Sequence, residues 1–197
     1  MSNLASSVTP LSALSALGNF SEEMNSISVS EVLGLGIVSM AIPSETRDAL
    51  SDVINQHYSI ALPTIGKLTQ SQTSNARFLG LQQDQLFMLF DYDGDRASEE
   101  ISAKVNASEQ LAYLSDQSDS WVTLRISGDR CLDALERICP LDIHPSAFPV
   151  GSVARTSMEH MATIIIHESE GSYLLLSLRS FAHSFLHAVT TSIKNIS

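Results

Sequence analysis

His183 and His187 form the pair whose spacing most suggests metal chemistry in this sequence. A helix would place side chains four residues apart on one face, so both imidazoles could bind one zinc ion. Zinc needs at least one further ligand, and no glutamate lies between the two histidines to complete an H-E-x-x-H pattern. We therefore predict that these histidines are surface or interface residues.

Residues 91–95, Asp-Tyr-Asp-Gly-Asp, are similar to the start of a calcium-binding loop. An EF-hand loop has glycine at its sixth position and glutamate at its twelfth. Here Gly94 is at the fourth position, and the twelfth is Ser102. The segment therefore predicts an Asp-Gly turn that leaves a strand and caps the next helix.

The patterns of common nucleophilic and phosphate-binding sites are missing from the sequence. Cys131 and Cys139 are eight residues apart without a C-x-x-C motif, which favours small buried thiols. Gly34 and Gly36 lack the third glycine of a dinucleotide-binding loop. There is no G-x-S-x-G motif and no glycine-rich loop ending in Lys-Ser or Lys-Thr. From residue chemistry alone, we expect no active site within this chain.

The hydrophobic pattern predicts the elements that must position these residues. Predicted strands lie at 27–42 (interrupted by Gly34 and Gly36), 110–116, 120–127, 152–158, 160–167 and 172–177, and a β-hairpin at 76–90. Predicted helices lie at 10–17, 45–57, 96–106, 128–138 and 179–193. The short helix 10–17 would not be stable alone, so we expect it to fray or to pack on a partner.

The order strand, helix, hairpin, helix occurs twice in this prediction, over about 27–108 and about 109–197. Helices segregated from a mixed or antiparallel sheet give an α+β fold. We therefore predict a single α+β domain made of two pseudo-repeats, preceded by a flexible N-terminal segment, 1–26.

The composition excludes several classes of function. The 197 residues carry a net charge of −11, which disfavours binding to nucleic acid or to an anionic membrane. No apolar run reaches the roughly 18 residues of a membrane helix. The first basic residue is Arg47, so we expect no signal or transit peptide, and two cysteines suit a cytoplasmic protein with reduced thiols.

Three segments of the second half carry a resemblance to a known family. They are DQSDSW (116–121), CPLDIHPSAFPVGSVART (139–156) and RSFAHSF (179–185). In combination these segments resemble the gamma subunit of heterotetrameric sarcosine oxidase. The resemblance is good over about 113–187, and in 27–90 it survives mainly as element order. It implies the fold of the folate-dependent aminomethyltransferases, whose core is a duplicated α+β unit.

The resemblance also implies a role in a complex with alpha, beta and delta subunits. Such a complex demethylates sarcosine oxidatively to glycine, forms hydrogen peroxide and passes the one-carbon unit to tetrahydrofolate. FAD, FMN, NAD and tetrahydrofolate would be held by the alpha and beta subunits, and zinc by the delta subunit. We therefore expect this chain to be a non-catalytic part that acts in assembly, with no catalytic, cofactor-binding or metal site of its own.

Eight residues of these segments, together with His187 just after the last one, are candidates for scaffold or interface roles: Asp116, Asp119, Trp121, His144, Phe148, Arg155, Phe181, Phe185 and His187. We expect the two aspartates to pair with the arginine and to order strand ends. The aromatic side chains are either core residues or interface anchors, because exposed aromatics are typical of binding hot spots.

Two other functions remain open at this stage. The chain could be a small folate-binding or aminomethyl-transferring enzyme, with Asp116 or Asp119 as its acidic group, or a free-standing protein-binding module.

The distribution of charge indicates where protein contacts lie, because charged residues are only 17% of the chain against a typical value of about 25%. Residues 1–110 carry a net charge of −8 and residues 111–197 carry −3. Since interfaces are depleted in charge, we expect the second half to make more of the protein contacts.

Overall fold

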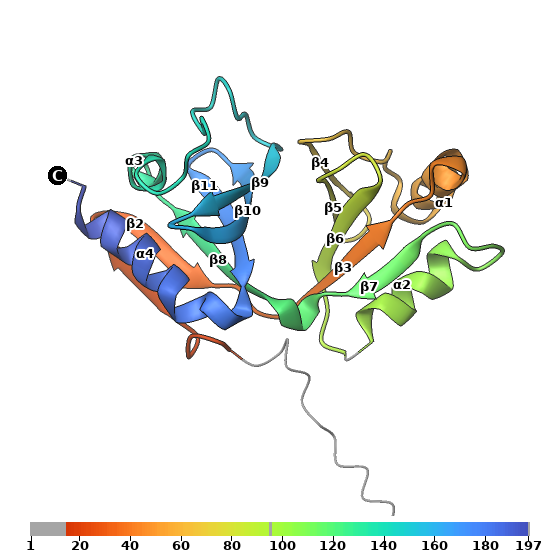
Figure 1. Cartoon of the computed structure of the whole chain (residues 1–197), viewed down its shortest axis with the longest axis horizontal. Helices are drawn as coiled ribbons and strands as arrows, with labels where there is room; N and C mark the ends of the chain where they lie inside the picture. Colours follow the sequence, from red (N-terminus) through yellow and green to blue (C-terminus); the bar gives the residue numbers. More distant parts are fainter. Residues whose placement is uncertain (1–14, 95, 197) are drawn as a thin grey trace, which may run out of the picture.

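The structure, a computed structural model, describes residues 15–94 and 96–196. Over these residues the chain forms two antiparallel sheets that face each other, with helices on the outer face of each (Figure 1). The larger sheet contains, in spatial order, β1 (Ser21–Met24), β2 (Ile27–Glu31), β8 (Trp121–Ser127), β11 (Ser172–Leu178), β10 (Met161–Ser169) and β9 (Val153–Met158). The smaller sheet contains β4 (Leu68–Gln70), β5 (Arg77–Gly80), β6 (Gln85–Asp91), β3 (Leu35–Ala41) and β7 (Tyr113–Asp116).

Helices α1 (Arg47–Tyr58) and α2 (Ala97–Val105) cover the smaller sheet, and α3 (Cys131–Glu136) and α4 (Ala182–Lys194) cover the larger one. Each long helix buries one stripe because its apolar residues recur every three or four positions. In α4 that stripe is Phe185, Val189 and Ile193, all at most 1% exposed.

The core lies in three layers. One apolar cluster joins α3 and α4 to the larger sheet, and a second joins α1 and α2 to the smaller sheet. The third cluster fills the space between the sheets, where Leu79 and Leu89 of the smaller sheet meet Ile164 and Leu176 of the larger. Central strands such as β10 are therefore buried on both faces.

The two repeats exchange their first strands. β2 comes directly before β3 in the chain but pairs with β8 of the other repeat, with Glu31 opposite Leu124. β7 likewise comes before β8 but pairs with β3, with Val38 opposite Asp116. Each sheet is therefore completed by a strand of the other repeat.

The α+β fold with a duplicated unit is confirmed, and the predicted helices from residue 45 onward lie within a few residues of α1 to α4. Several details differ. The strands form two sheets instead of one, and the short strands β1 and β4 were not predicted. Residues 21–24, assigned to a flexible N-terminal segment, are β1 and pair with β2. The predicted helix 10–17 lies mostly outside the described residues, and residues 16–18 are a bend.

Candidate functional site

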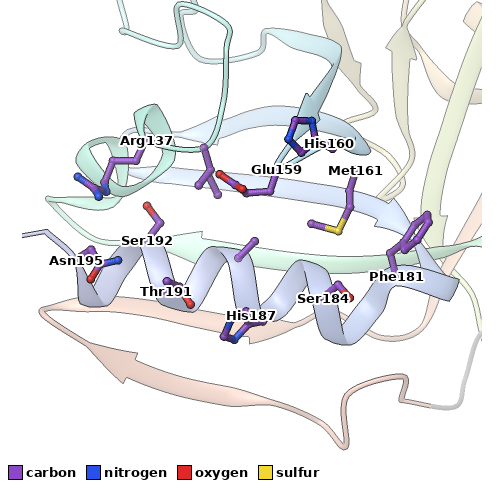
Figure 2. A pocket seen from close by; sticks show the side chains of 12 residues that line it. Arg137, Glu159, His160, Met161, Phe181, Ser184, His187, Thr191, Ser192 and Asn195 are labelled. Atoms are coloured by element: carbon purple, nitrogen blue, oxygen red, sulfur yellow. The ribbon is translucent and has the colours of Figure 1, made fainter.

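An open groove of about 640 Å³ lies between α4, the end of α3 and the turn that joins β9 to β10 (Figure 2). Ile138, Met161 and Ala188 give it apolar walls, and Phe181 lines one end. Figure 2 shows Met161 on the side of the groove opposite α4. The groove is wide enough for a side-chain-bearing peptide segment or a small organic molecule.

The position of α4 is fixed by its buried side and by a hydrogen bond to α3. Phe185 is fully buried, and the Ser192 hydroxyl donates to the carbonyl of Ala134 at 2.6 Å. The opposite side of the helix is exposed, with Phe181 at 45% just before it and His187 two turns later. Of the nine predicted residues, Phe181 and His187 are the two that line the groove.

The turn on the far side of the groove holds two residues in the left-handed region. Glu159 and His160 have φ of 45° and 67°, and the pairing of Met158 with Met161 makes them a two-residue hairpin loop. Such a loop favours Asn and Gly, since left-handed φ angles are costly for other residues. Two residues in a costly backbone conformation therefore lie at the edge of the groove.

A shared carboxylate joins the two sheets at another point. Glu168 of β10 accepts hydrogen bonds from Arg77 of β5 and, through two nitrogens, from Arg125 of β8. Its side chain is 14% exposed. Burial raises the pKa of Glu168, but the hydrogen bonds and charges of Arg125 and Arg77 outweigh burial and hold the pKa below its ordinary value.

Trp121 and Arg155 both contact Phe87 of the smaller sheet. The Trp121 and Phe87 rings meet edge-to-face at 5.8 Å, and the Arg155 guanidinium lies 5.1 Å from the Phe87 ring centre. Arg155 also donates to the side-chain oxygen of Gln85 at 3.0 Å. These contacts cross between the sheets, so both residues hold the two repeats together.

The predicted pairing of Arg155 with Asp116 and Asp119 is wrong, because Arg155 binds Gln85 and Phe87 instead. Asp116 accepts hydrogen bonds from the backbone amides of Ser118 and Ser98, and so orders the end of β7 beside the start of α2. Asp119 lies exposed in the 3-10 turn before β8.

His144 and Phe148 belong to the loop between α3 and β9. His144 is exposed, and its Nδ1 lies 2.8 Å from the Ser146 hydroxyl. Phe148 is 8% exposed, so it belongs to the core. Its carbonyl accepts a hydrogen bond from Nδ1 of His167, whose ring is stacked between Phe148 and Tyr173 at centroid distances of 6.4 and 4.4 Å. His167 ends the strand predicted at 160–167, and the structure shows it as a buried residue of β10.

The residues that suggested metal or thiol chemistry do not converge. Within residues 15–94 and 96–196, no group of three His, Cys, Asp or Glu side chains could hold a metal ion. Asp91 accepts a hydrogen bond from the Asn75 amide, and residue 95 of the calcium-like segment lies outside the described residues. Cys131 and Cys139 are both buried, and burial raises the pKa of Cys131 to about 11, which disfavours a reactive thiolate.

A family model for the sarcosine oxidase gamma subunit family matches residues 44–193 of this sequence. The chain belongs to that family. The match covers the first repeat from residue 44 onward and the second repeat to residue 193, and it includes the β9–β10 turn and all nine predicted residues. A comparison with curated proteins gives no match.

Solved structures agree with the gamma subunit assignment at the level of the fold. The chain is similar to a chain of heterotetrameric sarcosine oxidase from Corynebacterium sp. U-96, with a TM-score of 0.73, 19% identity, and coverage of 85% of this chain and 84% of that one. It is also similar to glycine cleavage system aminomethyltransferase T from Bartonella henselae, with a TM-score of 0.57 and 10% identity, over 81% of this chain and 44% of that one. The predicted aminomethyltransferase-like fold is confirmed. No helix in the described part of this gamma-subunit family member has the length and apolarity to cross a membrane.

Proposed function

We propose that the chain is the non-catalytic gamma subunit of a heterotetrameric sarcosine oxidase and acts in assembly. The observation that carries the proposal is the family match over residues 44–193, supported by the likeness to a chain of a heterotetrameric enzyme. The partners are the alpha, beta and delta subunits. Together they convert sarcosine to glycine and hydrogen peroxide and pass the one-carbon unit to tetrahydrofolate, in the cytoplasm.

The roles of the buried ionisable groups in this chain support a scaffold. Glu168 joins Arg77 and Arg125 across the sheets, and His167 binds a backbone carbonyl of the neighbouring loop. These groups hold the fold together, whereas a catalytic acid or base must face a cavity where substrate can reach it. In this proposal FAD, FMN, NAD, tetrahydrofolate and zinc are held by the other subunits.

Co-expression tests the proposal. The full chain, expressed with the alpha, beta and delta subunits, should co-elute with them on size exclusion, and the complex should oxidise sarcosine with release of hydrogen peroxide. The chain alone should not oxidise sarcosine. Failure to co-elute, or sarcosine oxidation by the isolated chain, would contradict the proposal.

A second candidate follows from the fold shared with aminomethyltransferase T, namely a small protein that binds folate and acts on its own. The described residues fit folate poorly. The space between the sheets is packed with apolar side chains, and the groove along α4 is open and has one carboxylate, Glu159. A titration with tetrahydrofolate separates the candidates, because saturable binding to the isolated chain would favour the second.

A further inference from the structure

Residues 171–197, which contain α4, have an unusual charge for this protein. The whole sequence has 22 acidic and 11 basic residues, but residues 171–197 contain no Asp or Glu and include Arg179 and Lys194. The exposed residues of α4 that line the groove are Ser184, His187 and Thr191. This stretch of surface is therefore neutral to basic on an acidic molecule.

The outer helices of the smaller sheet show the contrast. α1 exposes Asp48 and Asp52, and α2 exposes Glu99 and Glu100. These helices have the charged outer faces that are normal for solvated helices. Because α4 occupies the equivalent place on the larger sheet, its lack of acidic residues does not follow from its position in the fold.

The groove beside α4 is lined in part by residue types that are enriched at interfaces. Its lining includes Phe181, Met161 and Arg137, and aromatic residues, Met and Arg are the types enriched at interfaces. Phe181 is large and 45% exposed, as expected of an anchor that awaits a partner. The strained turn at Glu159 and His160 supports the same view, since strain is retained where it serves a function.

We propose that this groove is the docking site for another subunit of the oxidase complex, and that the docking segment presents apolar side chains to Phe181 and Met161 and a carboxylate to Arg137. The proposal rests on the proposed function. Charge complementarity selects this occupant, because Arg137 lines the groove, Glu159 is the one carboxylate in its lining, and residues 171–197 beside it carry Arg179 and Lys194 without any Asp or Glu. Desolvated charge pairs of this kind contribute to partner selection and to retention in the complex.

Competition within one preparation tests the proposal. Wild-type and variant chains are co-expressed in equal amounts with the alpha, beta and delta subunits, and mass spectrometry measures their ratio in the purified complex. We expect Phe181→Asp and Arg137→Glu to lower that ratio about tenfold or more. Arg137→Met keeps an apolar stem without the charge, so it should lower the ratio about threefold.

The matched control is Gln56→Glu, which adds a negative charge to the exposed face of α1. Its ratio should stay near one. If Phe181→Asp and Arg137→Glu enter the complex as readily as this control, the groove is not the docking site, although the proposed function stands. If the wild-type chain itself does not enter the complex, the proposed function fails. If only Phe181→Asp has an effect, the carboxylate on the partner is contradicted.

A measurement on the wild-type chain covers the case in which a variant fails to fold. Amide hydrogen exchange is compared between the free chain and the assembled complex. Backbone amides of α4 and of residues 158–161 should gain protection on assembly, whereas those of α1 should not. Unchanged exchange along α4 would overturn the proposal. A dimer of the free chain that Phe181→Asp dissociates would assign the groove to a second copy and would also overturn it.

Discussion

Glu168 on β10 and Arg77 on β5 form an ion pair across the two sheets, with 2.5 Å between the carboxylate oxygen and the guanidinium nitrogen. The two residues are 91 positions apart in the sequence and belong to different repeats. Arg125 of β8 forms a second ion pair with the same carboxylate, with 2.8 Å between its Nε and the carboxylate oxygen. The Glu168 carboxylate therefore connects the two repeats by charge. The apolar cluster between the sheets connects them as well.

Glu168→Gln should lower the free energy of unfolding by about 2 kcal/mol at pH 7, because it leaves Arg77 and Arg125 without their shared carboxylate. The Glu168 pKa is depressed in the folded state, so its stabilisation is present above the unfolded pKa of about 4.3 and is lost as the pH falls through the folded pKa. The stability difference between wild type and variant should therefore shrink below about pH 4. Urea unfolding from pH 3 to pH 7 measures it.

Glu170→Gln is the control, since Glu170 is exposed in the turn two residues away. It should change the stability by less than about 0.5 kcal/mol. Equal effects of the two substitutions would show that the Glu168 ion pairs do not stabilise the fold.

His167→Phe should destabilise the chain by about 1–2 kcal/mol. A phenyl ring can keep the stack with Phe148 and Tyr173, but it leaves the Phe148 carbonyl without its donor in a buried place. His167→Ala should cost about 3 kcal/mol, because it removes the stacking partner as well. Urea unfolding of both variants gives the order, and a His167→Phe variant as stable as wild type would contradict the role of the hydrogen bond.

His160→Gly should stabilise the isolated chain by about 0.5–1 kcal/mol, since glycine accepts the φ of 67° that histidine tolerates poorly. His160→Ala also removes the imidazole but keeps a Cβ, so it should bring no gain. Thermal unfolding compares the three chains. A stabilised His160→Gly chain that competes less well for the complex would show that the strained turn serves assembly.

Phe185→Ala should lower the free energy of unfolding by about 3–5 kcal/mol, because the Phe185 side chain is fully buried in the apolar cluster between α4 and the larger sheet. Phe181→Ala, four residues earlier at 45% exposure, should change the stability of the isolated chain by about 0.5 kcal/mol or less. Denaturant unfolding separates them. Similar losses for the two would place Phe181 in the core and would remove it from the docking surface.

Local patterns were enough to predict most elements, and the unpredicted ones lack such patterns. β1 reads Ser-Glu-Glu-Met and β4 has three residues, so neither shows the alternation of a half-buried strand. In β8, Arg125 alternates with buried apolar residues, which predicts the strand correctly. The pattern does not reveal that the face bearing Arg125 meets a second sheet.

The candidate site was predictable only along α4. Phe181 and His187 both belong to the predicted helix 179–193, so the sequence alone places them near each other. Arg137, which follows α3, and Met161 of β10 complete the groove, and no local feature of the sequence relates them to α4. The nine residues were chosen by likeness to a family, which marks segments but does not say which side chains face solvent.

The exchange of first strands also determines when each sheet can fold during synthesis on the ribosome. β2 is synthesised long before β8, to which it pairs through Glu31 and Leu124. At about 5–20 residues per second, the early strand waits several seconds or more with an unpaired edge. The nascent N-terminal half therefore depends on completion of its neighbour, and a chain cut between α2 and β7 should yield two pieces that become folded only when mixed.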